Sequence, residues 1–187
     1  MLLRGINVGG KNKVKMSELK EHLSTLGFSN VVPYINSGNL IFESDLEAQE
    51  IKEQIRRMLA EQYPFDILFA LIDAAAYAKA FSDLPDWWCG ELARRDVLFF
   101  TDEVDRDGMI EDIRGMKLHS EAVYFTDIGV FWGKFDEKEY LRTAYHKQLG
   151  SKVYYKQITI RNGNTAERIL RMLKGLMVPK GPYAVRK

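Results

Sequence analysis

The sequence predicts an α+β protein that contains two ferredoxin-like subdomains and a closing C-terminal helix. Hydrophobic periodicity and turn residues give the order strand, helix, strand, strand, helix, strand over residues 1–72. The same order recurs over residues 96–178 without repetition of the residues themselves, which indicates an old duplication. The chain has 187 residues, of which 46% are hydrophobic, so it is long enough for two small cores.

The first subdomain is predicted from short apolar stretches separated by turn and helix signals. We expect a helix from Ser17 to Leu26, stopped by Gly27, and a second helix to Gln62 that opens with a capping box at Ser44 and Glu47. A tight turn at residues 36–39 joins two strands of a hairpin. The expected strands cover residues 2–4, 31–35, 40–42 and 65–72.

Residues 73–95 are predicted to link or pack the two subdomains, with a short helix at 74–81 and an apolar joint at Trp87 and Trp88. The second subdomain should have strands at 97–101, 122–125, 128–132 and 153–160, and helices at 104–114 and 137–148. A closing helix is expected at 165–176, and residues 179–187 form a tail.

The loop from Arg4 to Lys15 is the main functional candidate. Its glycines, Gly5, Gly9 and Gly10, permit backbone conformations closed to other residues and leave N–H groups uncovered. Lys11, Lys13 and Lys15 add positive charge, and a helix follows. We therefore predict an anion site that includes Arg4, Asn7, Gly9, Gly10, Lys11 and Lys15.

The residues of this loop allow two other interpretations. Gly5, Gly10 and Lys11 match the first seven positions of a nucleotide-binding P-loop, but Asn12 stands where a hydroxyl must bind Mg²⁺, and the helix is expected to begin too late. A P-loop is therefore disfavoured. The glycines can also serve turn geometry alone, with the lysines merely solvated.

The expected topology places the turn Ser37, Gly38 and Asn39 at the same sheet edge as the loop. The equivalent edge of the second subdomain carries the acids Asp102, Glu103, Asp105 and Asp127. One edge is thus basic and its repeat is acidic, which suits an anionic ligand at the first edge or a basic protein partner at the second.

Arg161 and Asn162 end a predicted strand just before the closing helix. Asn162 can cap that helix. Alternatively, Arg161 can grip a phosphate or carboxylate with its guanidinium fork, and it would then share a cleft with Arg4. Both residues are therefore included in the predicted ligand site.

Composition limits the remaining classes. Cys89 is the single cysteine, and the three histidines give no metal-ligand spacing, so neither a disulfide nor a metal or other cofactor is expected. We expect a cytoplasmic protein, since no apolar run is long enough to span a membrane. Residues 1–20 carry +4 and residues 138–187 carry +10, which leaves −13 for the chain between them. Such segments can attract an anionic partner or one another.

Five landmark stretches resemble an uncharacterised bacterial family, domain of unknown function 1697. The stretches are Leu2 to Gly10, Ser37 to Asn39, Phe131 to Phe135, Thr143 to His146 and Thr159 to Asn162. The resemblance covers nearly the whole chain. It implies a cytoplasmic bacterial protein of two ferredoxin-like subdomains, and it implies no activity. Chains of that family usually begin a few residues before Leu2, so Met1 is expected inside the first strand.

The residues show no catalytic constellation, so the sequence favours non-catalytic binding of a phosphate-bearing metabolite or a nucleic acid at loop 5–15. Two alternatives remain open. One is a small enzyme that uses a cleft between the subdomains, with Arg161 or His146 in it. The other is a scaffold whose acidic edge holds a protein partner, or a homo-oligomer.

Overall fold

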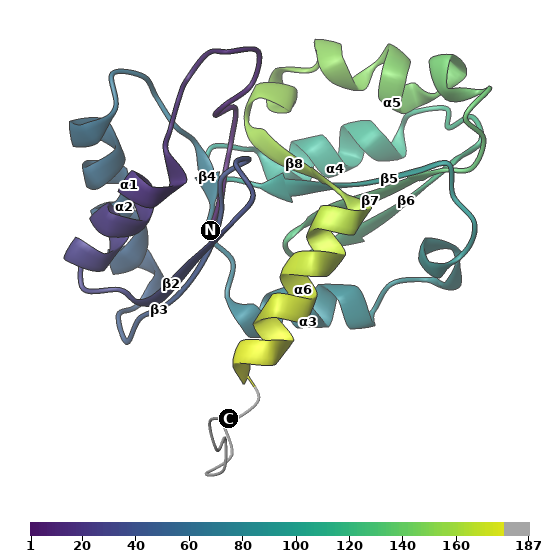
Figure 1. Cartoon of the computed structure of the whole chain (residues 1–187). Coiled ribbons are helices and arrows are strands. Elements are labelled where there is room, and N and C mark those ends of the chain that lie inside the picture. The colour runs from purple at the N-terminus through teal and green to yellow at the C-terminus, as the bar shows by residue number, and fades with distance from the viewer. Residues whose placement is uncertain (178–187) are drawn as a thin grey trace.

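A computed structural model describes residues 1–177 and shows a mixed α/β protein (Figure 1). Two four-stranded antiparallel sheets and six α-helices make up the described part of the chain. Both sheets have the same arrangement, in which the third strand along the chain lies between the first and second, and the fourth lies on the far side of the first.

The first sheet has the order β2-β3-β1-β4, and helices α1 and α2 cover one of its faces (Figure 1). Leu3, Leu40 and Phe69 from the sheet pack with Leu19 and Leu23 from α1 and with residues of α2. The elements are β1 (Leu2–Leu3), α1 (Met16–Thr25), β2 (Ser29–Tyr34), β3 (Asn39–Glu43), α2 (Ala48–Gln62) and β4 (Phe69–Ala70).

The second sheet has the order β6-β7-β5-β8, and α4 and α5 contribute to the core on its outer face. Its strands and the helix α4 are β5 (Arg94–Phe100), α4 (Arg106–Arg114), β6 (Glu121–Thr126), β7 (Gly129–Lys134) and β8 (Ile158–Asn162). Four short helical turns join β7 to β8, namely η2 (Tyr140–Arg142), α5 (Ala144–Lys147), η3 (Leu149–Ser151) and η4 (Val153–Lys156).

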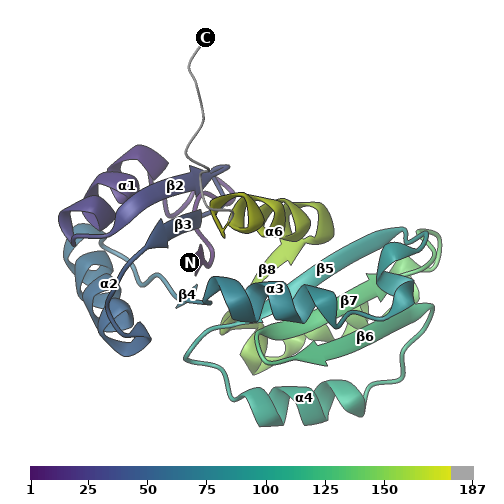
Figure 2. The ribbon, with the colours of Figure 1, turned by 90° about the horizontal axis from the view of Figure 1, so that it is seen from below.

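Two helices fill the space between the sheets, as Figure 2 shows. These are α3 (Ala74–Ser82) and α6 (Gly163–Met177), and the Tyr77 hydroxyl of α3 donates to the Ala166 carbonyl of α6 at 3.0 Å. A third core joins Leu2 and Ile41 of the first sheet to Phe99 and Phe131 of the second. The turn η1 (Asp86–Cys89) buries Trp88 in this core, so the predicted apolar joint is confirmed.

The strands and helices follow the predicted order, but several local predictions were wrong. Helix α2 begins after Glu47, and the Ser44 hydroxyl accepts from the N–H of Leu46, so no capping box forms. The single helix predicted at 137–148 is broken into turns. The strand predicted at 153–160 begins only at Ile158, because η4 precedes it.

The side chain of Glu121 explains why the helix at 137–148 is broken. Its carboxylate accepts from the N–H groups of Ala144 and Tyr145 at 2.6 and 3.0 Å, and the Thr143 hydroxyl accepts from the N–H of His146. These donors are the ones that a continuing helix would bond to its own preceding carbonyls. A new helix therefore starts at Ala144.

Two strands of the first subdomain's sheet, β1 and β4, are shorter than predicted. β1 and β4 have two residues each, because they pair only at Leu2 with Ala70 and Leu3 with Phe69. Met1 extends the pairing on the other side, since its amino group and carbonyl both bond to Leu40. The predicted tail, residues 179–187, lies outside the described residues.

Candidate functional site

The loop between β1 and α1 is a short exposed hairpin with two buried anchors. Ile6 and Val14 are 3% and 4% exposed, whereas residues 7–13 between them are exposed. Two backbone bonds close the hairpin, from Asn7 N–H to the Asn12 carbonyl at 3.0 Å and from Lys11 N–H to the Val8 carbonyl at 3.1 Å. We call residues 7–13 the finger.

Gly9 and Gly10 form the tip of the finger, with φ of +58° and +75°. A two-residue hairpin turn of type I′ needs positive φ at both positions, which glycine adopts without a steric penalty. Helix α1 begins at Met16, well after Lys11. The P-loop interpretation therefore fails in geometry as well as in sequence, and turn formation accounts for this pair of glycines.

Asn7 locks the base of the finger and ties it to the neighbouring hairpin. Its amide nitrogen donates to the carbonyls of Val14 and Asn36, both at 2.8 Å, and its amide oxygen accepts from the Val14 N–H at 2.9 Å. The expected proximity of the loop to the turn at residues 37–39 is thus confirmed. Gly38 packs so closely on Leu3 and Ile6 that an added Cβ would lie 2.7 Å from the Leu3 Cβ.

Backbone conformations of positive φ are concentrated at this site. Ten described residues have positive φ, and seven of them lie in the loop or the adjoining turn: Gly5, Asn7, Gly9, Gly10, Asn12, Ile35 and Gly38. Ile35 is notable because a β-branched residue at φ +48° is strained, and its side chain is 50% exposed. Strain of this kind is retained mainly where the surrounding structure and function require it.

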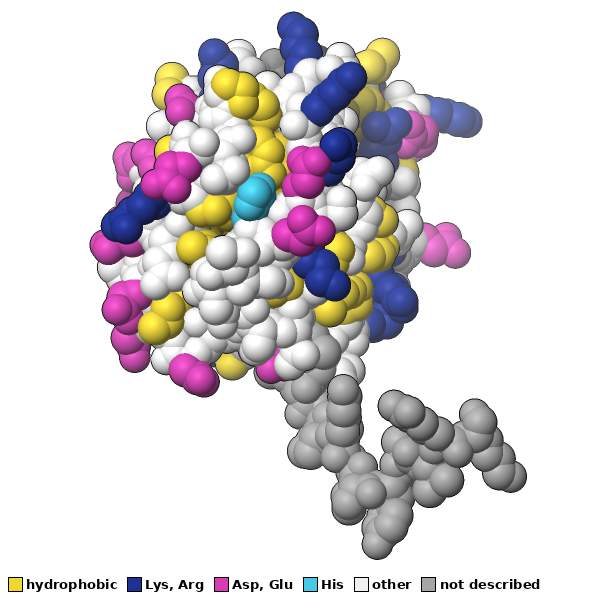
Figure 3. Space-filling view, turned by 60° about the vertical axis from the view of Figure 1, so that its left-hand side comes forward, with side chains coloured by type: hydrophobic (Ala, Val, Ile, Leu, Met, Phe, Trp, Pro, Cys, Tyr) yellow, Lys and Arg dark blue, Asp and Glu magenta, His cyan; other side chains and the backbone are white. Residues whose placement is uncertain are grey.

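The finger carries positive charge that no carboxylate of the described chain neutralises. Lys11 and Lys13 are exposed and form no ion pair among the residues described, whereas Lys15 pairs with Glu18 at 2.7 Å. This hydrogen bond raises the pKa of Lys15 above its usual value. Figure 3 shows lysine and arginine side chains gathered at the upper end of the molecule, the end where Figure 1 places the loop.

The second subdomain adds an aromatic and a cationic residue at the base of the loop. The Arg4 guanidinium lies over the Tyr155 ring at 5.6 Å and donates to the Ile158 carbonyl at 2.7 Å. Burial lowers the pKa of Arg4 from its usual value. Lys156 follows Tyr155 in η4 and is exposed. The sequence analysis did not include Tyr155 and Lys156 in the site, because it assigned them to a strand. Residues 152–156 nevertheless have the basic and aromatic character of a binding surface.

Arg161 lies in the seam between the two subdomains, where the protein itself occupies its guanidinium. Its Nε donates to the Asn39 amide oxygen, Nη1 to the Thr159 hydroxyl and the Ile160 carbonyl, and Nη2 to the carbonyls of Leu3 and Ser37. These five bonds match its five N–H groups. Burial lowers the pKa of Arg161 to about 10. Arg161 and Arg4 therefore lie at the same junction between the subdomains. The guanidinium of Arg161 binds backbone carbonyls there and does not face an open cleft.

Asn162 points to a different place from the other predicted residues. Its amide oxygen accepts from the N–H of Thr165 at 2.8 Å, which caps α6, so the capping interpretation is confirmed. It also lines a separate cavity of about 390 Å³ with Arg94, Arg95, Asp96 and Asn164. Ser37 and Asn39 remain with the loop, where the Asn39 amide nitrogen donates to the Ser37 hydroxyl at 3.0 Å.

Two carboxylates at the acidic edge of the second subdomain, Asp102 and Asp105, bind groups of the chain itself. Asp102 pairs with Lys52 at 2.7 Å and Arg56 at 2.5 Å, which joins α2 to the loop between β5 and α4. Asp105 caps α4 through the N–H of Gly108. Two of the four carboxylates of the acidic edge that the scaffold alternative needs therefore have internal partners.

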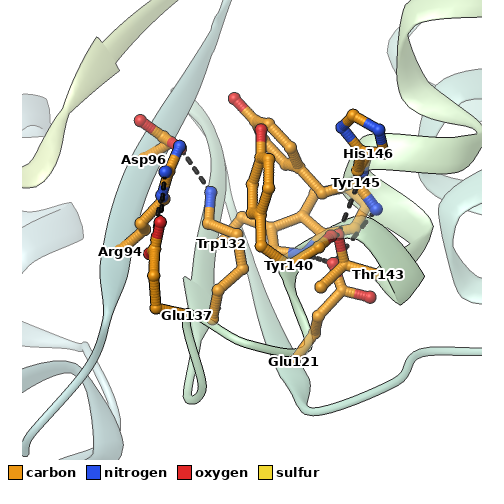
Figure 4. A network of polar contacts seen from close by, with 10 residues as sticks. Arg94, Asp96, Glu121, Trp132, Glu137, Tyr140, Thr143, Tyr145 and His146 are labelled. Carbon is orange, nitrogen blue, oxygen red and sulfur yellow. Dashed lines mark hydrogen bonds and ion pairs between the residues drawn. The ribbon is translucent and has the colours of Figure 1, made fainter.

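A cluster of polar and aromatic side chains lies where the second sheet meets the segment of η2 and α5 (Figure 4). Glu121 is 9% exposed and accepts from the Trp132 indole and from three backbone N–H groups. Lys134 is 1% exposed, pairs with Asp96 and lies 3.6 Å from the centre of the Tyr145 ring. Burial lowers the pKa of Lys134, although the Asp96 carboxylate opposes this. These groups satisfy one another, which makes the cluster part of the core.

No group of three or more His, Cys, Asp or Glu side chains that could hold a metal ion occurs within residues 1–177. No helix in the same residues is long and apolar enough to cross a membrane.

A family profile described as "Protein of unknown function (DUF1697)" matches residues 1–131, which include the finger, the turn at 36–39 and both sheets up to β7. The chain belongs to the DUF1697 family. No curated protein matches it.

A solved structure of the "conserved bacterial protein SP0830 from Streptococcus pneumoniae" is similar to this DUF1697 chain throughout. The two share 44% sequence identity and a TM-score of 0.89, over 92% of this chain and 96% of the other. The similarity covers a larger share of the chain than the profile match does. It supplies a fold and no activity.

Proposed function

We propose that this protein binds nucleic acid without catalysis, through the finger and the adjoining residues of η4. The single observation that carries the proposal is the finger itself, an exposed hairpin whose two lysines form no ion pair within residues 1–177. Phosphate contacts from lysine and arginine supply most of the non-specific affinity for nucleic acid. Gly9 and Gly10 keep the tip narrow, so that a phosphate backbone can approach Lys11 and Lys13 closely.

The shape of the site favours a polymer over a small metabolite. Four cavities formed by the described residues are lined by other parts of the chain, and none of these four includes a residue of the finger. A small phosphate-bearing metabolite is normally held in a concave pocket. A protruding element with exposed cations suits the extended surface of a nucleic acid instead.

Apolar and aromatic groups next to the lysines support the same ligand class. Val8 and Ile35 are 68% and 50% exposed, and the Asn7 to Asn36 bond brings their positions together. Tyr155 lies at the base of the loop under Arg4. Exposed apolar and aromatic side chains beside cations can contact bases while the cations contact phosphates.

Charge reversal at the finger tests the proposal. Fluorescence anisotropy with labelled single-stranded and duplex RNA and DNA at low salt should show binding by the parent. Lys11→Glu/Lys13→Glu should lose at least roughly tenfold in affinity. The matched control is Lys117→Glu/Lys147→Glu, which makes the same charge change at two exposed lysines of the second subdomain. It should lose much less.

Three outcomes would count against the proposal. The parent could bind none of the four nucleic acids, or the control pair could lose as much affinity as the finger pair, which would mean that only net charge matters. Competition by free ATP at micromolar concentration would assign the finger to a small phosphate-bearing molecule instead.

We also propose that the two subdomains are a duplication of a ferredoxin-like unit in a bacterial, cytoplasmic protein. The shared strand order and the antiparallel pairing of all strands support the first part. The bacterial source of the similar structure and the single cysteine of the chain support the second.

A further inference from the structure

A cavity of about 600 Å³ lies between the two subdomains. Strands β1 and β3 and the start of α2 form one side, and α3, the end of β5, the turn before β7 and α6 form the other. Its size is within the range of small-molecule sites, which often lie at such junctions. The finger contributes no residue to it.

The interior of this cavity is apolar. Its wall contains Leu2, Ile41, Phe100, Ile128, Ile169 and Leu173. An apolar group that binds here would move out of water and into contact with a surface that two sheets and two helices already hold in place. The cavity is therefore suited to an aliphatic or aromatic group.

Charged side chains line the rest of the cavity, and acids outnumber bases. Asp102 is balanced by Lys52 and Arg56, as described above. That leaves the carboxylates of Glu43, Asp73 and Asp127 against the single guanidinium of Arg106. All three acids are exposed, and none forms an ion pair within residues 1–177. The charge of these residues is therefore complementary to a cationic group.

We propose that this cavity binds a small amphipathic molecule, with an apolar body between the subdomains and one ammonium-type cation among Asp73, Asp127 and Glu43. This site is independent of the finger. Its ligand differs in charge from the one proposed there, so the two proposals stand or fall separately.

The first test uses N-phenyl-1-naphthylamine, an uncharged dye that fluoresces in apolar sites. The full chain should bind it saturably. Decylammonium, 1-decanol and decanoate, which share one chain and differ in head group, should then displace it with the cation at least severalfold more effective than the anion. Absence of saturable dye binding, or displacement by decanoate as effective as by decylammonium, would overturn the proposal.

Matched variants locate the site. Ala76 lines the cavity, so Ala76→Phe should fill part of it with a phenyl ring and abolish dye binding. The control Ala75→Phe, at an exposed position of the same helix, should leave dye binding unchanged. Asp73→Asn/Asp127→Asn should reduce the preference for decylammonium over decanoate and leave dye binding intact, because asparagine still caps α3. Lys11→Glu/Lys13→Glu should change nothing.

A measurement on the parent protein locates the ligand even if Ala76→Phe does not fold. Nuclear Overhauser effects from the decyl chain should reach the methyl groups of Ile41, Ile169 and Leu173 in the parent. Contacts only to other methyl groups would place the ligand elsewhere and contradict the proposal.

Discussion

The guanidinium Nε of Arg161, at the end of β8, donates to the amide oxygen of Asn39, at the start of β3. The two residues belong to different subdomains and are 122 positions apart in the chain. Through this bond and those to the Leu3 and Ser37 carbonyls, one arginine joins the second sheet to the strand and turn that support the finger. The candidate site is thus held by a buried polar seam.

Removing the arginine should destabilise the whole chain. Arg161→Met leaves the Asn39 amide oxygen and the Ser37 carbonyl without their donors, whereas the Leu3 carbonyl keeps the hydrogen bond from the Thr159 hydroxyl. Each buried unsatisfied acceptor costs about 1–3 kcal/mol. We expect the free energy of unfolding, measured by urea titration, to fall by about 3 kcal/mol or more. In a double-mutant cycle with Asn39→Leu, the coupling should exceed about 1 kcal/mol. Additive single effects would show that the bond contributes nothing specific.

Two glycines with nearly equal φ allow the effect of backbone strain to be measured separately from that of side-chain packing. Gly10 has φ +75° with open space around its Cα, and Gly38 has φ +76° with Leu3 and Ile6 against it. Gly10→Ala should cost about 1 kcal/mol, from the left-handed conformation alone. Gly38→Ala should cost clearly more, because the new Cβ overlaps the Leu3 Cβ. Thermal melting of the two variants measures both losses of stability. Equal losses in Gly10→Ala and Gly38→Ala would mean that the side chains around Gly38 move aside without a penalty.

Removing only one partner of the ion pair between Lys134 and Asp96 should destabilise the fold more than removing both charges. Lys134→Met leaves the Asp96 carboxylate without its cation and should reduce the free energy of unfolding by about 3 kcal/mol. Lys134→Met/Asp96→Asn removes both charges and should recover most of this loss. If the double variant is less stable than Lys134→Met alone, the pair is not the reason for the cost.

Acid should weaken the link between α4 and η4. Hydrogen bonds from the Lys152 ammonium and the Tyr154 hydroxyl hold the pKa of Asp112 below its usual value of 3.8. The unfolded chain therefore binds this proton more readily, so the stability that Asp112 contributes is present above its unfolded pKa and is lost as pH falls through the folded pKa.

We expect the free energy of unfolding to fall less between about pH 5 and about pH 3 in Asp112→Asn than in the parent. The effect should be small, because the Asp112 side chain is 36% exposed. Asp107→Asn, on the same helix, is the control and should leave the pH dependence closer to that of the parent. Identical pH profiles for the parent and Asp112→Asn would refute the expected linkage.

Local sequence signals predicted most strands and helices, and topology then predicted that the finger and the turn at residues 37–39 are neighbours. The helix at 137–148 could not be predicted as broken, because Glu121, which breaks it, is distant in sequence. The role of Arg161 was also hidden, since its partners Leu3, Ser37 and Asn39 come from the other subdomain. Tyr155 and Lys156 were assigned to a strand, although their composition carried a binding signal.

The number of phosphates that the finger contacts is the most direct measure of the proposed function. The observed binding constant for a single-stranded RNA should fall linearly with salt on logarithmic axes, because bound lysines release counterions. Lys11→Gln/Lys13→Gln should reduce the magnitude of that slope by roughly 1–2. A slope that is unchanged in the variant, with the fold intact, would show that Lys11 and Lys13 do not contact nucleic acid and would contradict the account.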